Sequence, residues 1–369
     1  MTLQMILLFL GGLALLVGGG ELLVRGASRF AVSVGISPLV VGLTVVAFGT
    51  SAPELAVSVL ASLTGEADLA VGNVVGSNIS NILLILGLSA LVAPLTVSQQ
   101  LVRLDVPLMI GVSVVMLLMA LNGNISTLEG TILFGGVVLY SVFAIRKSRS
   151  ESRNVKEQYE EEFGAHSSAR RTTRQTTVDI VLVMTGIALL VSGSRLLVVA
   201  AVSMAQSFGV SELVIGLTIV AIGTSLPELA TSVVAAVKGE RDIAVGNVVG
   251  SNLFNILCVL GLTAVVVPSG VSVAPAALSF DIPIMIAVSV ACLPVFFTGF
   301  AIRRWEGGLF VFYYLTYISY LVLQAAEHDA LHAFSRTMLW FVIPITLITL
   351  TVITVQALRK QRSGRISGS

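Results

Sequence analysis

The sequence predicts an all-α polytopic membrane protein made of two inverted five-helix repeats and an eleventh, C-terminal helix. Of its 369 residues, 56% are hydrophobic and only 11% are charged, whereas a soluble domain carries about 25% charged residues. Apolar runs of about 20 residues, the length that crosses a hydrocarbon core, recur along the whole chain. A long segment of the first half also returns in the second half, in an arrangement that requires the two copies to be inverted.

Eleven apolar runs are expected to span the membrane. They lie at residues 4–23, 37–63, 69–94, 104–122, 127–145, 178–200, 211–237, 243–268, 282–300, 307–325 and 337–357. The one long charged stretch, at residues 147–177, separates the fifth run from the sixth, and its composition suits a solvated loop.

The distribution of basic residues predicts which side of the membrane each loop occupies. With eleven spans, 19 of the 21 Lys and Arg residues fall on one side, and only Arg195 and Arg336 fall on the other. Because basic loops remain in the cytoplasm, the N-terminus is predicted outside, and the central loop and C-terminus inside. We therefore expect a multi-pass protein of a cell membrane, in contact with the lipid bilayer and with no nucleic-acid partner.

The internal repeat aligns residues 37–94 with residues 211–268 at a constant offset of 174, with 39 identities over 58 positions. Each copy holds five spans, and because five is odd the second copy must enter the membrane upside down. The turns agree, since residues 64–68 (TGEAD) contain no basic residue and residues 238–242 (KGERD) contain two. Many secondary transporters are inverted repeats with a substrate site near mid-membrane at the repeat interface.

The predicted spans and repeats divide the chain into four parts. They are a first repeat at 1–146, a cytoplasmic loop at 147–177, a second repeat at 178–325, and a C-terminal span with a basic tail at 326–369.

Each repeat places a proline and a glutamate side by side within an apolar span, as Pro53 with Glu54 and Pro227 with Glu228. A proline has no amide hydrogen, so each span is predicted to break there and to leave a backbone carbonyl without its helical partner. Inside a membrane, such backbone is tolerated only where it lines a polar cavity, and a buried acid is costly and usually functional. The alternative is a buried pair of acids neutralised by protonation.

Hydroxyl groups surround both breaks, at Thr50, Ser51, Thr224 and Ser225. Together with the freed carbonyls and the carboxylates they form a cluster of oxygen atoms only. Ca²⁺ accepts about 6–8 oxygen ligands, and Na⁺, which has a similar radius, uses the same donors. No His, and no Cys beside either carboxylate, is available to bind zinc or copper.

The third and eighth spans carry further paired polar residues. Ser77 and Asn81 are four residues apart and so share a helix face, as do Ser251 and Asn255. Glycines four residues apart are expected to allow close helix packing, and the other asparagines to form hydrogen bonds between helices. These are Gly72, Gly76, Gly246 and Gly250, and Asn73, Asn78, Asn247 and Asn252. Among the remaining charges, Glu21 is expected to pair with Arg25, and Asp105 and Asp281 to cap helix N-termini.

The motifs GTSAPEL and GNVVGSNISN, repeated as GTSLPEL and GNVVGSNLFN, resemble the paired alpha-repeats of the sodium/calcium exchanger family, within the calcium/cation antiporter superfamily. The resemblance covers the first ten spans and implies a ten-helix core with ions bound among its second, third, seventh and eighth helices. It implies that Glu54 and Glu228 bind Ca²⁺ with the carbonyls of Thr50 and Thr224. It also implies sodium sites at Ser51, Ser77, Ser225, Ser251 and the carbonyls of Ala47 and Ala221, with Asn81 and Asn255 lining the central position.

At two places the sequence differs from other branches of the superfamily, which weighs against potassium co-transport and against proton coupling. Both central positions are asparagine, whereas the potassium-dependent branch carries an aspartate at one of them. The proton-coupled branch has an acid where this chain has Gly76-Ser77 and Gly250-Ser251. The short central loop leaves no room for a regulatory domain, which favours a prokaryotic exchanger.

The sequence therefore predicts a secondary active antiporter that exchanges Na⁺ for Ca²⁺ by alternating access around Glu54 and Glu228. An antiporter of the same fold that couples H⁺ to Ca²⁺ or another divalent cation is the main alternative, followed by a cation channel. No enzymatic activity is expected, because no His or Asp completes a catalytic set near the glutamates. Beyond the transported Na⁺ and Ca²⁺ no cofactor is expected, a monomer suffices, and the first and sixth spans are candidates to slide as a gate.

Overall fold

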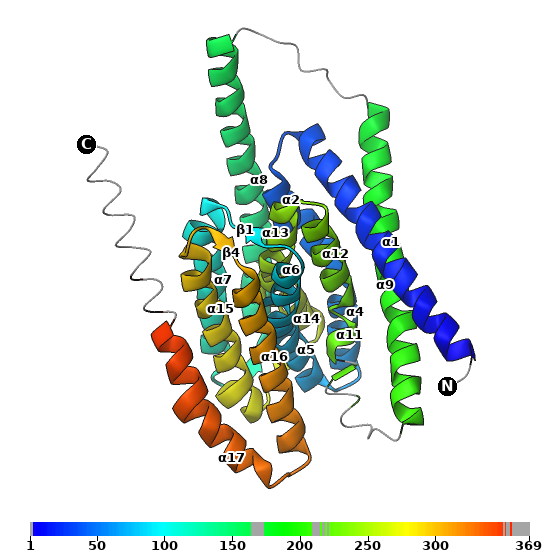
Figure 1. Cartoon of the computed structure of the whole chain (residues 1–369), viewed down its shortest axis with the longest axis vertical. Coiled ribbons are helices and arrows are strands. Elements are labelled where there is room, and N and C mark those ends of the chain that lie inside the picture. Colours follow the sequence, from blue (N-terminus) through cyan, green and yellow to red (C-terminus); the bar gives the residue numbers. More distant parts are fainter. Residues whose placement is uncertain are drawn as a thin grey trace.

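The computed structural model describes residues 3–163, 173–208 and 221–349, together with residues 215, 218, 219, 351 and 355. These residues form a helical bundle (Figure 1). Nine described helices are long and apolar enough to cross a membrane, and the bent pair Pro38–Thr50 with Ala52–Leu63 supplies a tenth span. The predicted seventh span is described from residue 221 onward, and most of its first half lies outside the described residues.

The first repeat contains five crossings. These are α1 (Leu3–Val34); the broken span α2 (Pro38–Val41), η1 (Gly42–Val46), α3 (Ala47–Thr50) and α4 (Ala52–Leu63); α5 (Ala67–Ser80), η2 (Asn81–Leu86) and α6 (Gly87–Val92); η3 (Leu101–Asp105) and α7 (Val106–Ala120); and α8 (Thr127–Phe163). The elements labelled η are π-helical turns within longer helices.

The second repeat has the same order, and one further helix follows it. It comprises α9 (Thr173–Ser207); α11 (Ala221–Gly223) and α12 (Leu226–Val237); α13 (Arg241–Phe254), η5 (Asn255–Leu260) and α14 (Gly261–Val266); η6 (Ala277–Asp281) and α15 (Ile282–Phe297); and α16 (Arg304–Ala325). The additional helix is α17 (Ala330–Thr337), which continues into η7 (Met338–Val342).

Two short strand pairs confirm that the repeats are inverted. Strand β1 (Leu95–Thr96), which follows the third crossing, pairs with β4 (Ala301–Ile302), which follows the fourth crossing of the second repeat. Strand β2 (Asn124–Ile125) pairs with β3 (Val271–Ser272) in the reciprocal way. Loops after the third and the fourth crossing lie on opposite sides in two repeats of the same orientation. Their pairing therefore requires opposite orientations, and Figure 1 shows β1 beside β4 at one end of the bundle.

The two first helices of the repeats pack against each other along one flank of the bundle (Figure 1). A Cβ added at Gly12 of α1 would lie 2.8 Å from the Leu197 backbone, and one added at Gly186 of α9 would lie 2.6 Å from that of Leu23. Such contacts between backbones require residues without a side chain. Helices α1 and α9 therefore form one closely packed pair.

Two predictions of local structure were wrong. The segment 147–177, expected to be a loop, is helical at both ends, because α8 continues to Phe163 and α9 begins at Thr173. Asp105 and Asp281 are not N-caps, since π-helical turns extend both helices in front of them. Their carboxylates instead accept hydrogen bonds, at 3.1 Å from the Tyr140 hydroxyl and at 2.9 Å from the Tyr317 hydroxyl.

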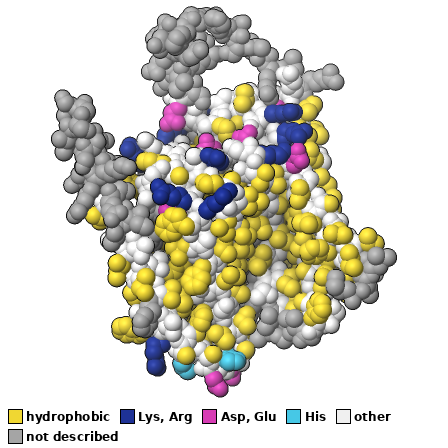
Figure 2. Space-filling view, in the orientation of Figure 1, with side chains coloured by type: hydrophobic (Ala, Val, Ile, Leu, Met, Phe, Trp, Pro, Cys, Tyr) yellow, Lys and Arg dark blue, Asp and Glu magenta, His cyan; other side chains and the backbone are white. Residues whose placement is uncertain are grey.

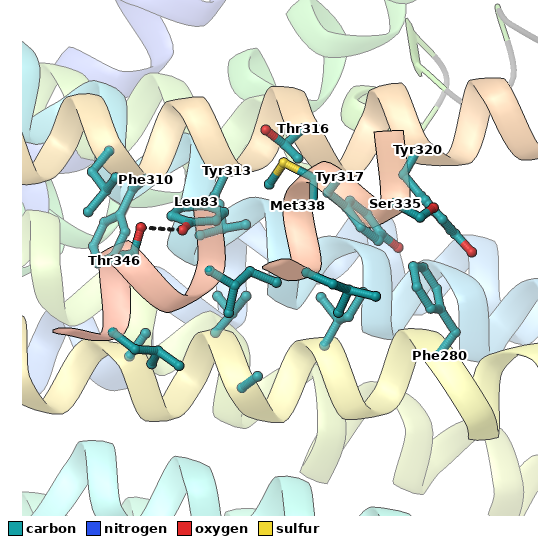
Figure 3. Close-up of a pocket in the computed structure, with 18 of the residues that line it drawn as sticks. Leu83, Phe280, Phe310, Tyr313, Thr316, Tyr317, Tyr320, Ser335, Met338 and Thr346 are labelled. Atoms are coloured by element: carbon teal, nitrogen blue, oxygen red, sulfur yellow. Dashed lines mark hydrogen bonds between the residues drawn. The ribbon is translucent and has the colours of Figure 1, made fainter. Parts of the chain in front are cut away.

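The eleventh helix lies at the periphery, beside α15 and α16 (Figure 1). An apolar cavity of about 430 Å³ separates these three helices, and Figure 3 shows its lining side chains, Phe280 and Met338 among them. At one end the Tyr313 hydroxyl donates a hydrogen bond to Thr346 Oγ1 at 2.6 Å. An almost wholly apolar lining between membrane-spanning helices suits contact with lipid acyl chains.

Gly250 provides a test of a close backbone contact with the first broken span. A Cβ at this position would lie 2.7 Å from the Cα and the carbonyl oxygen of Leu43, and backbone atoms cannot rotate away. Gly250→Ala is therefore expected to lower stability by about 1–3 kcal/mol, measured as thermal unfolding in detergent. Gly18→Ala is the control, because a Cβ there meets nothing within 4 Å. Equal unfolding temperatures for Gly250→Ala and the wild type would contradict this packing.

Candidate functional site

Both predicted helix breaks are present. Helix α3 ends at Thr50 and α4 begins at Ala52, so that Ser51 forms the break and Pro53 lies in the first turn of α4. A proline is tolerated there because amide hydrogens in the first turn have no helical acceptor. The second repeat has the same arrangement, with Ser225 between α11 and α12.

Each break places its glutamate in the first turn of a helix. Glu54 is in the first turn of α4 and Glu228 in the first turn of α12, and both are fully buried. The positive end of the helix dipole favours negative charge at this position. The ion pairs of the described residues include neither carboxylate. The centre of the bundle therefore carries a formal charge of −2 when both groups are ionised.

The serine of each break binds the glutamate of the other repeat. Ser51 Oγ donates to Glu228 Oε1 at 3.3 Å, and Ser225 Oγ donates to Glu54 Oε1 at 3.4 Å. Ser77 of α5 donates to the same oxygen of Glu54, also at 3.4 Å. The two breaks thus meet at one site.

The third helix of each repeat adds hydroxyl and amide groups. Ser77 Oγ lies 3.0 Å from Ser225 Oγ and accepts a hydrogen bond from Asn255 Nδ2 at 3.1 Å. Asn81 Nδ2 donates to Asn252 Oδ1 at 2.9 Å. Ser251 Oγ lies 3.5 Å from Thr50 Oγ1, on the other side of the site.

Four buried oxygens at the site have no hydrogen-bond donor: Glu54 Oε2, Glu228 Oε2, Asn81 Oδ1 and Asn255 Oδ1. They are one carboxylate oxygen and one amide oxygen from equivalent positions of each repeat. An unsatisfied buried acceptor costs free energy, and a buried carboxylate oxygen costs more than a neutral one. A cation that bound all four would remove this cost.

The remaining predicted ligands lie around the same breaks. The carbonyl of Ala47 accepts from the Ser51 amide at 3.0 Å and from Thr50 Oγ1 at 3.3 Å. The Thr224 hydroxyl donates to Asn73 Oδ1 at 3.3 Å. Ala221 begins α11, and its side chain lies outside the described residues.

Two asparagines expected to bond between helices hold the glutamate backbones. Asn73 Nδ2 donates to the Glu54 carbonyl at 3.2 Å and to Ser58 Oγ at 3.0 Å. The equivalent Asn247 bonds the Glu228 carbonyl at 3.4 Å and Ser232 Oγ at 3.0 Å. Sequence reasoning did not single out the two serines, although each lies one turn after its glutamate in both copies.

A second feature that the sequence analysis missed satisfies one of the freed carbonyls. Pro227 cannot donate to the carbonyl of Gly223, and Ser194 Oγ of α9 donates to that oxygen at 2.6 Å. The equivalent position in the first repeat is Gly20, which has no hydroxyl. The freed carbonyl is thus capped from α9 in the second repeat, whereas the equivalent residue of α1 is a glycine, which cannot donate such a bond.

The site offers neutral and anionic oxygen atoms as potential cation ligands. Among the described residues no group of three or more His, Cys, Asp or Glu could hold a metal ion. The ligands would be two carboxylates with hydroxyl, amide and carbonyl oxygens, a set that suits Ca²⁺ and Na⁺ better than Zn²⁺ or Cu²⁺. A buried oxygen cluster between two inverted repeats defines the protein as a secondary cation transporter by class.

Comparison with known proteins gives the family. Residues 4–146 and 178–323 match the family described as sodium/calcium exchanger protein, and the chain belongs to this family of membrane antiporters. Its members are transporters and not enzymes.

Relatives and solved structures agree with this assignment. The putative antiporter CaxA of Alkalimonas amylolytica is 43% identical over 76% of this chain and 86% of its own. The inner membrane protein YrbG of Escherichia coli is 43% identical over 77% of this chain and 86% of its own. The sodium/calcium exchanger MaX1 of Methanosarcina acetivorans is 34% identical over 85% of this chain and 97% of its own. A structure of the sodium-calcium exchanger NCX_Mj superposes with a TM-score of 0.73 and 28% identity, over 86% of this chain and 99% of that one.

Ser194→Ala tests the capping of the freed carbonyl. The Gly223 oxygen would lose its donor, so stability should fall by about 1–3 kcal/mol in thermal unfolding. Ser289→Ala is a matched control, because that buried hydroxyl donates at 2.8 Å to the Met285 carbonyl of its own helix. Equal losses of stability in the two variants would show that the bond to Gly223 contributes no more than an ordinary bond within a helix.

Proposed function

We propose that this antiporter exchanges Na⁺ for Ca²⁺ across a cell membrane at the site between the two breaks. The observation that carries the proposal is the set of four buried oxygens without donors, two of them carboxylate oxygens, at equivalent positions of the repeats. Relatives whose names include sodium/calcium exchange support Na⁺ as the coupling ion.

The proposed ligands are those that the motif positions predict. Ca²⁺ is bound by Glu54, Glu228 and the carbonyls of Thr50 and Thr224. Sodium binds at Ser51, Ser77, Ser225, Ser251 and the carbonyls of Ala47 and Ala221, with Asn81 and Asn255 at the central position. The hydroxyls that now donate to the carboxylates support this assignment, since a hydroxyl that rotates its hydrogen away presents a lone pair to a cation.

Charge makes the two cations compete. Two carboxylates are neutralised by one Ca²⁺, and Na⁺ ions in the same site neutralise the same charge. A neutralised site costs less to move through a low-dielectric barrier than one with a net charge of −2, so exchange is favoured over uncoupled movement. The repeats at 1–146 and 178–325 would then expose the site to each side in turn.

We propose that the end of the bundle at which α8 ends and α9 begins faces the cytoplasm. The N-terminus lies at the opposite end of the bundle (Figure 1). Most Lys and Arg side chains visible in Figure 2 lie at the α8–α9 end, above a broad hydrophobic band. The positive-inside rule places such an end in the cytoplasm and the N-terminus outside.

Uptake of radioactive Ca²⁺ into Na⁺-loaded proteoliposomes tests the coupling ion and both carboxylates. Dilution into choline medium should drive uptake by the wild type, whereas Glu54→Gln and Glu228→Gln should lose at least ten-fold, because each removes one of two ligand charges. Glu327→Gln, in the exposed turn before α17, is the matched control with full activity. Wild-type uptake that ignored Na⁺ and followed a pH gradient would reassign the coupling ion to H⁺. Uptake without any counter-ion would indicate a channel.

The net charge moved per cycle is a separate prediction. Three Na⁺ in a site of charge −2 leave +1, so three-for-one exchange would be electrogenic and would respond to voltage. Solid-supported membrane recordings should show a Na⁺-driven current that requires Ca²⁺ on the other side. Full Ca²⁺ exchange without current would contradict this stoichiometry.

A further inference from the structure

The gating helix α1 is tied to the turn between α12 and α13. Lys238 Nζ lies 2.8 Å from Glu21 Oε1, and Ser28 Oγ donates to Glu240 Oε1 at 2.9 Å. A Cβ at Gly20 of α1 would lie 3.2 Å from the Ala230 carbonyl of α12, so α1 and α12 are also in close contact. These contacts hold α1 against α12 at the end where α12 turns into α13.

The repeat offset identifies the equivalent positions at the other end. Glu21 of α1 corresponds to Arg195 of α9, and Glu240 corresponds to Glu66 in the turn between α4 and α5. The turns have the same backbone form, with φ of 90° at Gly65 and 80° at Gly239. Glu21 of α1 thus pairs with Lys238 in a turn that also holds Glu240, whereas the equivalent residue of α9 is basic and its turn carries Glu66, with Thr64 in place of the lysine.

In this structure Arg195 and Glu66 do not form an ion pair with each other. Arg195 and Glu66 are exposed, and the ion pairs of the described residues do not include them. The face of α4 that α9 would cover is also open, since Leu60 is 65% exposed whereas its equivalent, Val234, is partly covered by α1. The ionic contact of α1 with the α12–α13 turn is therefore formed, and its equivalent between α9 and the α4–α5 turn is not formed among the described residues.

Inverted repeats exchange their conformations when the transporter changes its facing. In the opposite facing, α9 would then approach the turn between α4 and α5 as α1 now approaches the turn between α12 and α13. Arg195 would replace Glu21 in that contact, and Glu66 is the acidic residue of the turn that it would meet. The exchanged signs keep the contact attractive, and they also suit opposite sides of the membrane, where basic turns remain in the cytoplasm.

We propose that Arg195 and Glu66 form a second ionic latch, which closes only when the latch between Glu21 and Lys238 opens. The two pairs thus position the gating helices at alternate ends, and their relative strength sets the ratio of the two facings. This inference rests on the alternating access of the proposed function, but not on which ion is transported.

Spin-label distances test the latch without any transport measurement. The full chain would be labelled at Thr64→Cys and Ser207→Cys, after replacement of the buried Cys258 and Cys292 by alanine, and studied in lipid nanodiscs. The label pair spans α9 and the α4–α5 turn, so its short-distance population reports closure of that end. Lys238→Gln releases the latch seen here, should raise this population, and serves as the background for the other variants.

Arg195→Gln and Glu66→Gln should each lower the short-distance population about two- to five-fold, the range for an exposed ion pair. The double variant should lose no more than either single one, and Arg195→Glu with Glu66→Arg should restore the population. Arg336→Gln, an exposed cation outside the gate, is the control. Distances that match this control, or losses that add in the double variant, would overturn the latch. A response of the distances without Na⁺-driven uptake would keep the latch and reject the proposed function.

Discussion

The structure depends on two carboxylates that are buried together, with no basic partner among the residues that the structure describes. Removing a charge from water is expensive, and two like charges at one site add their repulsion. Helix N-termini and serine hydroxyls offset part of this cost, and the serine of each break reaches the glutamate of the other repeat. Neither repeat can complete the site alone, which explains why the carboxylate and its hydroxyls occur in duplicate. The oxygens left without donors are the groups that the proposed cation would bind.

The helices around the site are of two kinds, those that hold the glutamates and those that contact the breaks from outside. Asn73 of α5 and Asn247 of α13 donate to the backbone carbonyls of the glutamates, so the backbone of each glutamate is held by a neighbouring membrane-spanning helix of its own repeat. Helices α1 and α9 contact each other through glycines and reach the breaks from outside, as the bond from Ser194 to Gly223 shows. In the proposed alternating access, α1 and α9 would move while the bonds from Asn73 and Asn247 to the glutamates stay in place.

Much of this could be predicted from the sequence, because the strongest signals were duplicated. A proline beside an acid in an apolar span has a physical cost that only a polar site relieves, and its recurrence at a fixed offset located both halves. Contacts that are not duplicated could not be found in this way, as with Ser194, whose equivalent is a glycine. The N-cap prediction also failed where a π-helical turn lengthens a helix. Asp105 therefore lies inside a helix, and its carboxylate accepts a hydrogen bond from a tyrosine. Similar turns begin at Asn81 and Asn255, with no sequence signal that marks them.

The repeats are most alike at the site and differ where the gate closes. The glutamates, the serines and the central asparagines are identical in the two copies, so both repeats present the same polar groups to the site. Glu21 and Lys238 differ from their equivalents Arg195 and Thr64, and these are the residues at the two ends of the gate. A transporter with identical halves would populate its two facings equally in a symmetric membrane. The two proposed latches are among the differences that can favour one facing, whereas the residues between the two breaks are the same in both repeats.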